Sequence, residues 1–514
     1  MAIVLVTAGS LFADAARRFA DRPALGDGVS YRSLDREVNR VASGLAALHL
    51  TGDQRVAVLA YNRPELVAVW LGLERAGLVR LVLHSHFEMA LHVAMVKRTG
   101  ATALVFDTRF TEAVEAELDR LDGVRLFVGL GEECPSWATP YAELLQLGAA
   151  EPMAVEVDEE APMCIQPTTG TTGTPKPWVV SHRAWQTLVV HNLIHLGGME
   201  PFGREEVNLH VHALQWASGA QTLLPYMLTG ACTCVLDDSA FDPTAIVAAI
   251  EATGATGLLL PGPMLALVLD AIEAQGRFSH RLRRLVTLFC SPELLERTTR
   301  VLGPVWCHGY GSTEQGAPVS RLLAREAASR PASVGRLASP LIELAVLDRH
   351  QKELPPGRIG EIAVRSTMSS SRYWDDPELT DSASARGGWF RSGDLGMLDE
   401  EGFLTYIDRS RDAISTPAGV VHPHEVEAAV LRHQAIANCG AVGLGTEGEQ
   451  EVVAAVVLKP DASAEPEEIA SVASDGLEPL AHPRVVIVSD LPVVLGGAKV
   501  QRDVLRGQLL AAKA

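Results

Sequence analysis

Short β-rich runs alternate with helical periods along the first ~400 residues, and this alternation constrains the fold more than any other feature of the chain. Residues 55–61 (RVAVLAY) have the apolar character of a buried strand. Residues 63–77 (RPELVAVWLGLERAG) then predict a helix, because Pro64 suits a first helical turn and Gly77 suits a helix end. Further strand–helix pairs follow up to residues 284–290 (RLVTLFC). The pattern predicts an α/β fold with layered β-sheets and helices.

The chain changes character at residues 398–412 (LDEEGFLTYIDRSRD), which combine a turn, a strand and a second turn with alternating charges. Beyond this point, short strands flank the acidic helical stretch at residues 465–477 (EPEEIASVASDGL). We therefore predict a large N-terminal domain of several subdomains over residues 1–408, and a small α+β domain over residues 409–514.

Charge and composition exclude several classes of function. The net charge of the 514 residues is -19, and no Lys/Arg stripe offers a path for a nucleic-acid backbone. No apolar run reaches the roughly 20 residues of a membrane helix. The seven cysteines form no CxxC pair, which argues against a zinc site and for a reducing compartment. The C-terminus is not the Ser-Lys-Leu signal, which argues against peroxisomal import by that tag. From the cysteines we expect a cytoplasmic protein.

A loop of threonines and glycines precedes a lysine that stands between two prolines. The stretch reads TTGTTGTPKP and comprises Thr168, Thr169, Gly170, Thr171, Thr172, Gly173 and, after Pro175, Lys176. Such a loop offers unhindered backbone N–H groups, hydroxyls and a positive charge, which suit a polyphosphate. The Walker pattern does not fit, because no GK[ST] follows the second glycine. Many loops of this composition bind nothing, so the loop by itself leaves phosphate binding open.

Four further motifs follow this loop in order: YGSTE at residues 310–314, RSGD at 391–394, DRSRD at 408–412, and a lysine in GGAKVQR at 496–502. The series resembles the adenylate-forming superfamily, which comprises acyl- and aryl-CoA synthetases, peptide-synthetase adenylation domains and beetle luciferases. The resemblance covers nearly the whole chain.

The resemblance implies that the protein joins a carboxylate to the α-phosphate of ATP, releasing pyrophosphate, and then passes the acyl group to a thiol. Mg²⁺ is the implied cofactor, and ATP and CoA are the implied substrates. The small domain is then mobile and serves each half-reaction in turn, with a hinge at Arg411 or Asp412.

The resemblance also assigns roles to single residues. The residues of the threonine–glycine loop and Lys176 match the site of the β- and γ-phosphates. Thr313 would reach the α-phosphate, and Glu314 would hold Mg²⁺. Asp394 would bind the ribose hydroxyls, and Arg409 the ribose or a phosphate. Lys499 would bridge the carboxylate and the α-phosphate. Tyr310, Gly311 and Ser312 complete the implied nucleotide site.

Departures from the family gather around ATP. Pro177 and the bulky Trp178 follow the loop lysine, and this proline removes one backbone donor. Ser415 and Ala418 stand in the hinge loop where lysine and glycine are common, and Ala498 precedes Lys499. Two interpretations stay open. Either the enzyme performs both steps, or adenylation is impaired and it mainly transfers a supplied acyl-adenylate to CoA. Loading of a separate carrier protein, and a catalytically silent adenylate-binding protein, are further alternatives.

The acyl pocket is expected between residues 210–219 and the strand leading to YGSTE. Trp216 stands where relatives have histidine or an aromatic gate, although it could equally be a core tryptophan. Gly309 and Gly311 are expected to leave space along the pocket wall for a rigid or polycyclic acid, and Gly219 is a further expected pocket residue. We expect a hydrophobic or aromatic monocarboxylate, with His210 and His212 as polar candidates. A separate adenylating enzyme, a carrier protein and a homodimeric partner stay open.

Overall fold

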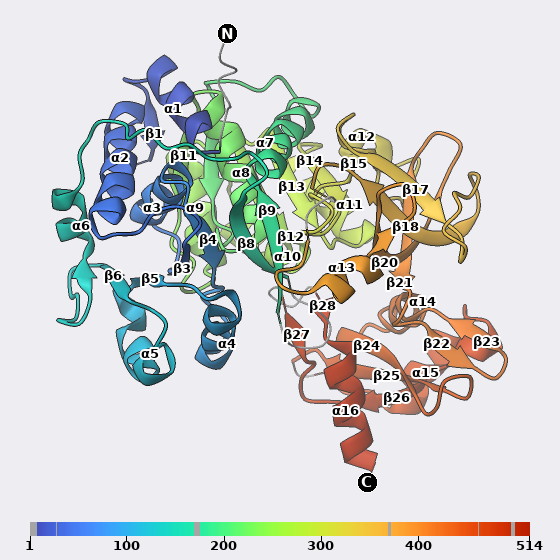
Figure 1. Cartoon of the computed structure of the whole chain (residues 1–514). Coiled ribbons are helices and arrows are strands. Elements are labelled where there is room, and N and C mark those ends of the chain that lie inside the picture. Colours follow the sequence, from blue (N-terminus) through green and yellow to red (C-terminus); the bar gives the residue numbers. More distant parts are fainter. Residues whose placement is uncertain are drawn as a thin grey trace.

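The computed structural model describes residues 8–26, 28–168, 175–368, 372–460, 462–494 and 499–513. It consists of a large domain and a small C-terminal domain, which lies at the lower right in Figure 1. Within the described ranges, no helix is both long and apolar enough to cross a membrane.

The first sheet of the large domain has the strand order β7-β6-β5-β3-β4-β8-β9 and is parallel except for its last strand. Its strands are β3 (Arg55–Leu59), β4 (Val79–Val82), β5 (Ala103–Asp107), β6 (Leu126–Leu130), β7 (Thr139–Pro140), β8 (Pro162–Thr168) and β9 (Lys176–Ser181). The helical segments between them are α3 (Pro64–Arg75), α4 (Met89–Thr99), η1 (Thr108–Phe110), α5 (Thr111–Glu115), η2 (Leu118–Arg120) and α6 (Tyr141–Leu147). The predicted helix at residues 63–77 is confirmed as α3, and Gly77 follows it with a left-handed φ of 69°.

A second sheet has the order β16-β15-β14-β13-β12-β10-β11-β1-β2. Its strands are β1 (Pro23–Leu25), β2 (Val29–Ser30), β10 (Val207–His210), β11 (Cys232–Val235), β12 (Gly257–Pro261), β13 (Arg284–Leu288), β14 (Trp306–Tyr310), β15 (Ser320–Leu323) and β16 (Arg336–Leu337). The helices of this part are α1 (Ala8–Arg18), α2 (Tyr31–Ala47), α7 (His182–Gly197), α8 (Ala217–Leu228), α9 (Pro243–Thr253), α10 (Gly262–Gln275), α11 (Pro292–Leu302) and α12 (Ala324–Ala327). One buried core joins the two sheets and includes Trp70 of α3, Trp185 of α7 and Leu224 of α8.

A third, antiparallel sheet has the order β17-β18-β20-β19, and β21 pairs with β20. It comprises β17 (Glu343–Leu347), β18 (Ile359–Arg365), β19 (Ser384–Ala385), β20 (Trp389–Leu398) and β21 (Leu404–Arg409), with α13 (Pro377–Ser382) before β19. The predicted boundary at residues 408–409 falls within β21, one residue before this strand ends.

The small domain has a mixed sheet of order β24-β25-β26 and two short hairpins. Its elements are β22 (Ile414–Thr416), β23 (Gly419–Val421), α14 (Pro423–Val430), β24 (Ile436–Leu444), β25 (Glu451–Leu458), α15 (Pro466–Ser474), η3 (Pro479–Ala481), β26 (Arg484–Ile487), β27 (Val493–Val494), β28 (Lys499–Val500) and α16 (Arg502–Lys513). One cluster of buried residues packs α14 and α15 on the sheet, and a second packs α16. The predicted fold class, a large layered α/β domain with a small α+β C-terminal domain, is confirmed.

The carboxyl ends of parallel strands carry the segments that bear the sequence motifs. β8 leads into the threonine–glycine loop, β14 ends at Tyr310, and β10 leads into residues 211–216. Within each sheet these strand ends lie along one edge, because the strands run in parallel. In open α/β sheets, ligands bind at this edge.

Candidate active site

Three residues predicted for the nucleotide site meet at the third sheet. Asp394 of β20 lies opposite Arg409 of β21 in the strand register, and Arg409 Nε lies 3.0 Å from Asp394 Oδ1. The Tyr310 hydroxyl, at the end of β14, donates a hydrogen bond of 2.6 Å to Asp394 Oδ2. The Asp394 backbone N–H donates to Ser392 Oγ at 2.9 Å. The fold thus gathers residues from three separate motifs around one carboxylate that is only 5% exposed.

Burial and charge fix the protonation of this group's members. Burial, and then the Asp394 carboxylate, raises the pKa of Tyr310 well above its usual range, so this phenol stays a neutral donor. Burial works to lower the pKa of Arg409, but Asp394 and the neighbouring tyrosines raise it above its ordinary value. The result is a permanently charged guanidinium and a neutral phenol that orient one carboxylate.

Glu314, the predicted Mg²⁺ ligand, lies in the loop that follows β14. This loop is closed by hydrogen bonds from Ala317 N to Ser312 O (3.2 Å) and from Gly316 N to Thr313 O (3.3 Å). The Tyr373 hydroxyl donates to Glu314 Oε1 at 3.1 Å, and no other hydrogen bond to this carboxylate occurs among the residues that the structure describes. A half-buried carboxylate with spare oxygen lone pairs suits a hard cation such as Mg²⁺.

The described residues contain no cluster of three or more His, Cys, Asp or Glu side chains that could hold a metal ion. A Mg²⁺ ion at Glu314 would therefore take its remaining oxygen ligands from phosphate and water, which is the usual arrangement for this ion.

The base of the phosphate loop is a β-hairpin in which Thr168 pairs with Lys176. Thr169, Gly170, Thr171, Thr172 and Gly173 lie outside the described residues. Lys176 Nζ lies 6.0 Å from the centre of the Tyr373 ring. Tyr373 thus contacts both the lysine of the loop and the carboxylate of Glu314.

The departures Pro177 and Trp178 belong to the packing beneath this site. Trp374 N donates to Pro177 O at 2.8 Å, and Val179 N donates to Arg372 O at 2.8 Å, so residues 372–374 are tied to β9. Trp178 is 1% exposed, and its ring lies edge-on to Tyr373, with the centres 4.9 Å apart. The bulky residue therefore points into the core and holds Tyr373 in place. Our sequence reasoning missed Tyr373, which stands outside every motif and 59 residues after Glu314.

The predicted hinge residues Arg411 and Asp412 lie in the turn between β21 and β22. Arg502 of α16 pairs with Asp412 (3.4 Å) and with Glu427 of α14 (2.8 Å), which ties the turn to the small domain. The backbone of Lys499 pairs with Val494 in the β27–β28 hairpin, on the side of the small domain that faces the large domain in Figure 1. The side chain of Lys499 lies outside the described part of the chain.

Trp216, predicted to line the acyl pocket, precedes α8 and lies among aromatic rings. Its ring centre is 4.2 Å from that of His84, 6.0 Å from that of Phe87 and 6.5 Å from that of His212. Trp216 is half-buried, whereas His84 and His212 are buried. Trp216 thus borders a polar region of the interior.

The three predicted pocket glycines serve close packing of the chain. A Cβ at Gly219 would lie 2.3 Å from Ala213 O, and one at Gly311 would lie 2.8 Å from Ala317 Cβ. A Cβ at Gly309 would lie 3.2 Å from Pro318 Cβ. The expectation that Gly309 and Gly311 leave space for a ligand on that side is corrected, because residues 317–318 fill it.

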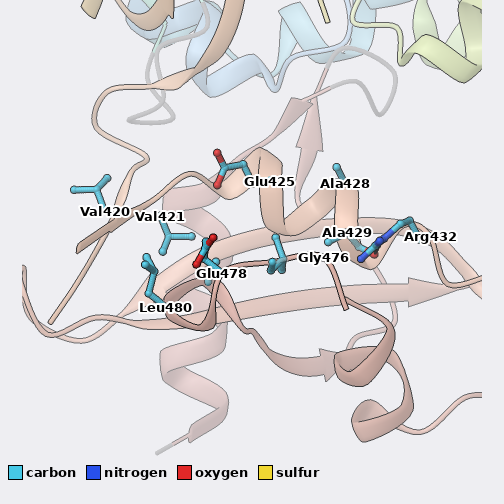
Figure 2. A pocket seen from close by; sticks show the side chains of 11 residues that line it. Val420, Val421, Glu425, Ala428, Ala429, Arg432, Gly476, Glu478 and Leu480 are labelled. Atoms are coloured by element: carbon cyan, nitrogen blue, oxygen red, sulfur yellow. Dashed lines mark hydrogen bonds between the residues drawn. The ribbon is translucent and has the colours of Figure 1, made fainter. Parts of the chain in front are cut away.

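Two cavities lie away from these residues. One, of about 450 Å³, lies in the small domain between α14, β23 and residues 476–481, where Glu425 and Arg432 line it (Figure 2). The other, of about 600 Å³, opens at the amino ends of β10 and β11 and contains Arg22, Arg204, Arg281 and Arg283. None of the predicted site residues lines either cavity.

Comparison with known proteins agrees with this geometry. A family model described as "AMP-binding enzyme" matches residues 12–374, and its companion "AMP-binding enzyme C-terminal domain" matches residues 425–494. The chain belongs to the AMP-binding enzyme family. The predicted resemblance to adenylate-forming acyl-CoA synthetases, and with it the predicted enzyme class of acid–thiol ligase, is confirmed.

Curated relatives of this AMP-binding enzyme carry names of CoA ligases. It is 29% identical to indoleacetate–CoA ligase of Aromatoleum aromaticum over 431 residues. This aligned region covers 84% of this chain and 83% of that protein. It is 28% identical over 510 residues to the medium/long-chain-fatty-acid–CoA ligase FadD8 of Mycobacterium tuberculosis, covering 94% and 87% of the two chains. The crystal structure of the anthranilate CoA ligase AuaEII in complex with anthranoyl-AMP superposes with a TM-score of 0.89 over 100% of this chain and 99% of that one. At 21% identity, this last match shows the shared fold.

Proposed function

We propose that this enzyme is an acyl-CoA ligase that converts a hydrophobic or aromatic carboxylic acid to its CoA thioester through an acyl-AMP intermediate. The observation that carries the proposal is the buried Asp394 carboxylate, oriented by Tyr310 and Arg409. A carboxylate held in this way can accept hydrogen bonds from two ribose hydroxyls. Family membership and the CoA-ligase names of the relatives support the same activity.

In the first step, an oxygen of the substrate carboxylate attacks the α-phosphorus of ATP, and the bond to the pyrophosphate leaving group breaks. The threonine–glycine loop and Lys176 hold the β- and γ-phosphates, and Thr313 contacts the α-phosphate. Glu314 would hold Mg²⁺, which would neutralise charge on the phosphates. Lys499 bridges the carboxylate and the α-phosphate. In the second step, the CoA thiol, as thiolate, attacks the acyl carbon and AMP leaves.

The domains proposed for this cycle are residues 1–408 and 409–514, with the hinge at Arg411 and Asp412. Rotation there brings Lys499 toward the nucleotide for adenylation and removes it for thioester formation. The Asp412–Arg502 ion pair moves with the small domain, since Arg502 is also bound to Glu427 of that domain. The seven free cysteines support a reducing compartment, for which we propose the cytoplasm.

A second candidate activity is transfer from a supplied acyl-adenylate without adenylation. Pro177 favours it, because a proline at the base of the phosphate loop removes one N–H donor from the β- and γ-phosphate side. The groups on the AMP side are unaffected by this change.

ATP–pyrophosphate exchange with a panel of aromatic acids, run beside CoA transfer from synthetic acyl-AMP, separates the candidates. We expect both activities. Transfer without exchange would establish the second candidate, and absence of both would refute acyl-CoA ligation.

Lys499→Ala supplies a sharper test within the same assays. We expect it to reduce pyrophosphate exchange at least a hundredfold, as loss of a charge-stabilising group does, while transfer from acyl-AMP is retained. Equal loss of both activities would contradict the role of Lys499. Lys513→Ala, at the C-terminal end of α16, is the matched control and should affect neither.

A further inference from the structure

A group of buried polar side chains lies beside the nucleotide site and has no place in the chemistry described so far. We call His84, His210, His212 and Gln215 the His–Gln cluster. Their exposed fractions are 2%, 3%, 7% and 2%, respectively. His84 follows β4, and the other three lie at or after the end of β10, so both segments leave the carboxyl ends of parallel strands.

The cluster adjoins the start of the phosphate loop. Gln166 Nε2, in β8, donates to the backbone carbonyl of Gln215 at 2.6 Å. The His84 Nε2 atom lies 3.4 Å from Pro167 O, and Thr168 is the next residue along the strand. Trp216 covers His84 with its ring. The cluster is therefore built into the same strand end that carries the predicted triphosphate loop.

Several polar atoms of the cluster have no hydrogen-bond partner within the described part of the chain. They are Oε1 and Nε2 of Gln215, Nδ1 of His84 and Nε2 of His210. Buried polar groups are nearly always paired, because leaving one unpaired forfeits its interaction with water. In Gln215, both the oxygen and the nitrogen of the side-chain amide lack a partner within the described residues. This indicates that a ligand forms hydrogen bonds with them.

The electrostatic environment selects a neutral ligand group. Burial lowers the pKa of His84 and of His212 to about 3 and that of His210 to about 4, so all three imidazoles are uncharged at neutral pH. A neutral imidazole carries one donor and one acceptor. In His84 the donor is Nε2–H, which faces Pro167 O, so the free Nδ1 is an acceptor. The nearby carboxylate of Asp238 accepts a hydrogen bond from Asn62 N at 2.5 Å through Oδ1, while its Oδ2 lies 3.6 Å from His86 Nε2 and has no hydrogen-bond partner among the described residues. The cluster can therefore exchange hydrogen bonds with a ligand but offers it no counter-ion.

We infer that Gln215, with His84 and His210, recognises a hydroxyl or carbonyl group on the acyl part of the substrate. The preferred acid is then an aromatic or alicyclic carboxylic acid with such a substituent, and plain hydrocarbon acids are disfavoured. The inference rests on the proposed acyl-CoA ligase function and narrows the hydrophobic acid expected from the sequence. Gln215 would be the residue that determines specificity, since its amide can both donate to and accept from the substituent.

The test compares pairs of acyl-sulfamoyl-adenosines, stable analogues of acyl-AMP, that differ only by one hydroxyl or ketone on the acyl group. Binding to the full-length enzyme is measured by calorimetry. We expect at least one polar member to bind roughly a hundredfold more tightly than its apolar partner, because a site built for hydrogen bonds rejects a ligand that lacks them. In Gln215→Met the preference should fall to within about threefold, with affinity for the apolar member retained.

Thermal unfolding of the ligand-free proteins gives a readout independent of activity. Gln215→Met should not lower Tm, since it removes two unpaired polar atoms at similar volume. The matched control is Asn192→Leu in α7, which removes a buried amide whose Nδ2 donates to Leu188 O at 2.9 Å, and which should lower Tm. It should leave the binding preference unchanged.

Two outcomes would overturn the inference while the proposed function stands: equal binding of both members of every pair, or a preference that survives in Gln215→Met. A fall of Tm in Gln215→Met as large as in Asn192→Leu would also overturn it, since the amide would then be paired in the free enzyme. Failure of every analogue to bind would instead refute the proposed function, and the inference with it.

Discussion

The group around Asp394 and the His–Gln cluster differ in how many of their buried polar atoms have partners within the protein. Around Asp394, both carboxylate oxygens have partners, a phenol and a guanidinium. In the His–Gln cluster, the amide of Gln215 has none among the described residues. The first group, which we propose binds the nucleotide common to all substrates, is already organised in the free protein. The second, in our inference, is completed only by a ligand, which suits the part of a substrate that varies between enzymes.

Asp394→Ala removes the carboxylate that pairs with Tyr310 and Arg409, and it should have the largest effect. It leaves Arg409 and Tyr310 without their partner in a largely buried position, so we expect the free energy of unfolding to fall by about 2–3 kcal/mol, discounted because Arg409 is 29% exposed. Binding of an acyl-adenylate analogue should weaken at least a hundredfold, which calorimetry can measure. Asp394→Asn, which keeps the shape, should be closer to wild type in stability. Unchanged affinity in Asp394→Ala would argue against the ribose contact.

Tyr373→Phe tests whether the hydrogen bond from the Tyr373 hydroxyl to Glu314 orients this carboxylate for Mg²⁺. The substitution removes the hydroxyl that donates to Glu314 Oε1 but keeps the ring that packs on Trp178. We expect adenylation to fall about tenfold, since loss of one orienting hydrogen bond to a ligand of a metal typically costs ten- to a hundredfold. The measurement is pyrophosphate exchange as a function of Mg²⁺ concentration.

Glu314→Gln provides the reference for full loss of the proposed ligand, and its defect should exceed that of Tyr373→Phe. If Tyr373→Phe shifts neither the rate nor the Mg²⁺ dependence, Tyr373 has a packing role only.

Lowering the pH should reduce the stability of the protein through the His–Gln cluster, and this effect should be smaller than those of the substitutions above. The pKa of His210 is lowered to about 4 in the folded protein, below the ordinary value of 6.5, so the unfolded chain binds more protons between these values. Its contribution to stability is complete above pH 6.5 and is lost as the pH falls toward 4. From pH 7.5 to pH 5.5, the free energy of unfolding should therefore decline, and His210→Gln should lessen this decline by about 1 kcal/mol. Denaturant unfolding at the two pH values checks this, and an unchanged decline would contradict it.

Much of the fold could be predicted from local patterns. Pro64 and Gly77 delimit α3, the apolar run at residues 55–61 forms β3, and the change of texture near residue 400 marks the passage to the small domain. These features depend on neighbouring residues and on the period of apolar side chains, which the sequence displays directly. The motifs assigned to the nucleotide could also be recognised from the sequence, because each consists of a few consecutive residues.

Other features depended on contacts between distant segments. In the sequence, Trp178 is a bulky departure next to the phosphate loop, and the structure buries it against Tyr373 and Phe390. Gly311 was predicted to leave space, yet Ala317 fills it. In both cases the residue is surrounded by side chains that its local sequence motif does not contain. A local pattern therefore cannot predict these contacts.

The sequence by itself determined the order of elements, the presence of a small C-terminal domain and the residue types that we propose for phosphate, ribose and metal. Only the tertiary structure decided which of these side chains are paired and which are left for a ligand. The reason is that pairing requires burial and hydrogen-bond geometry together, and both arise when strands distant in sequence are packed into sheets. Tyr310 meets Asp394 across 84 residues because the end of β14 lies against the middle of β20. The packing of β4, β8 and β10 likewise buries the amide of Gln215 without giving it a partner in the described chain.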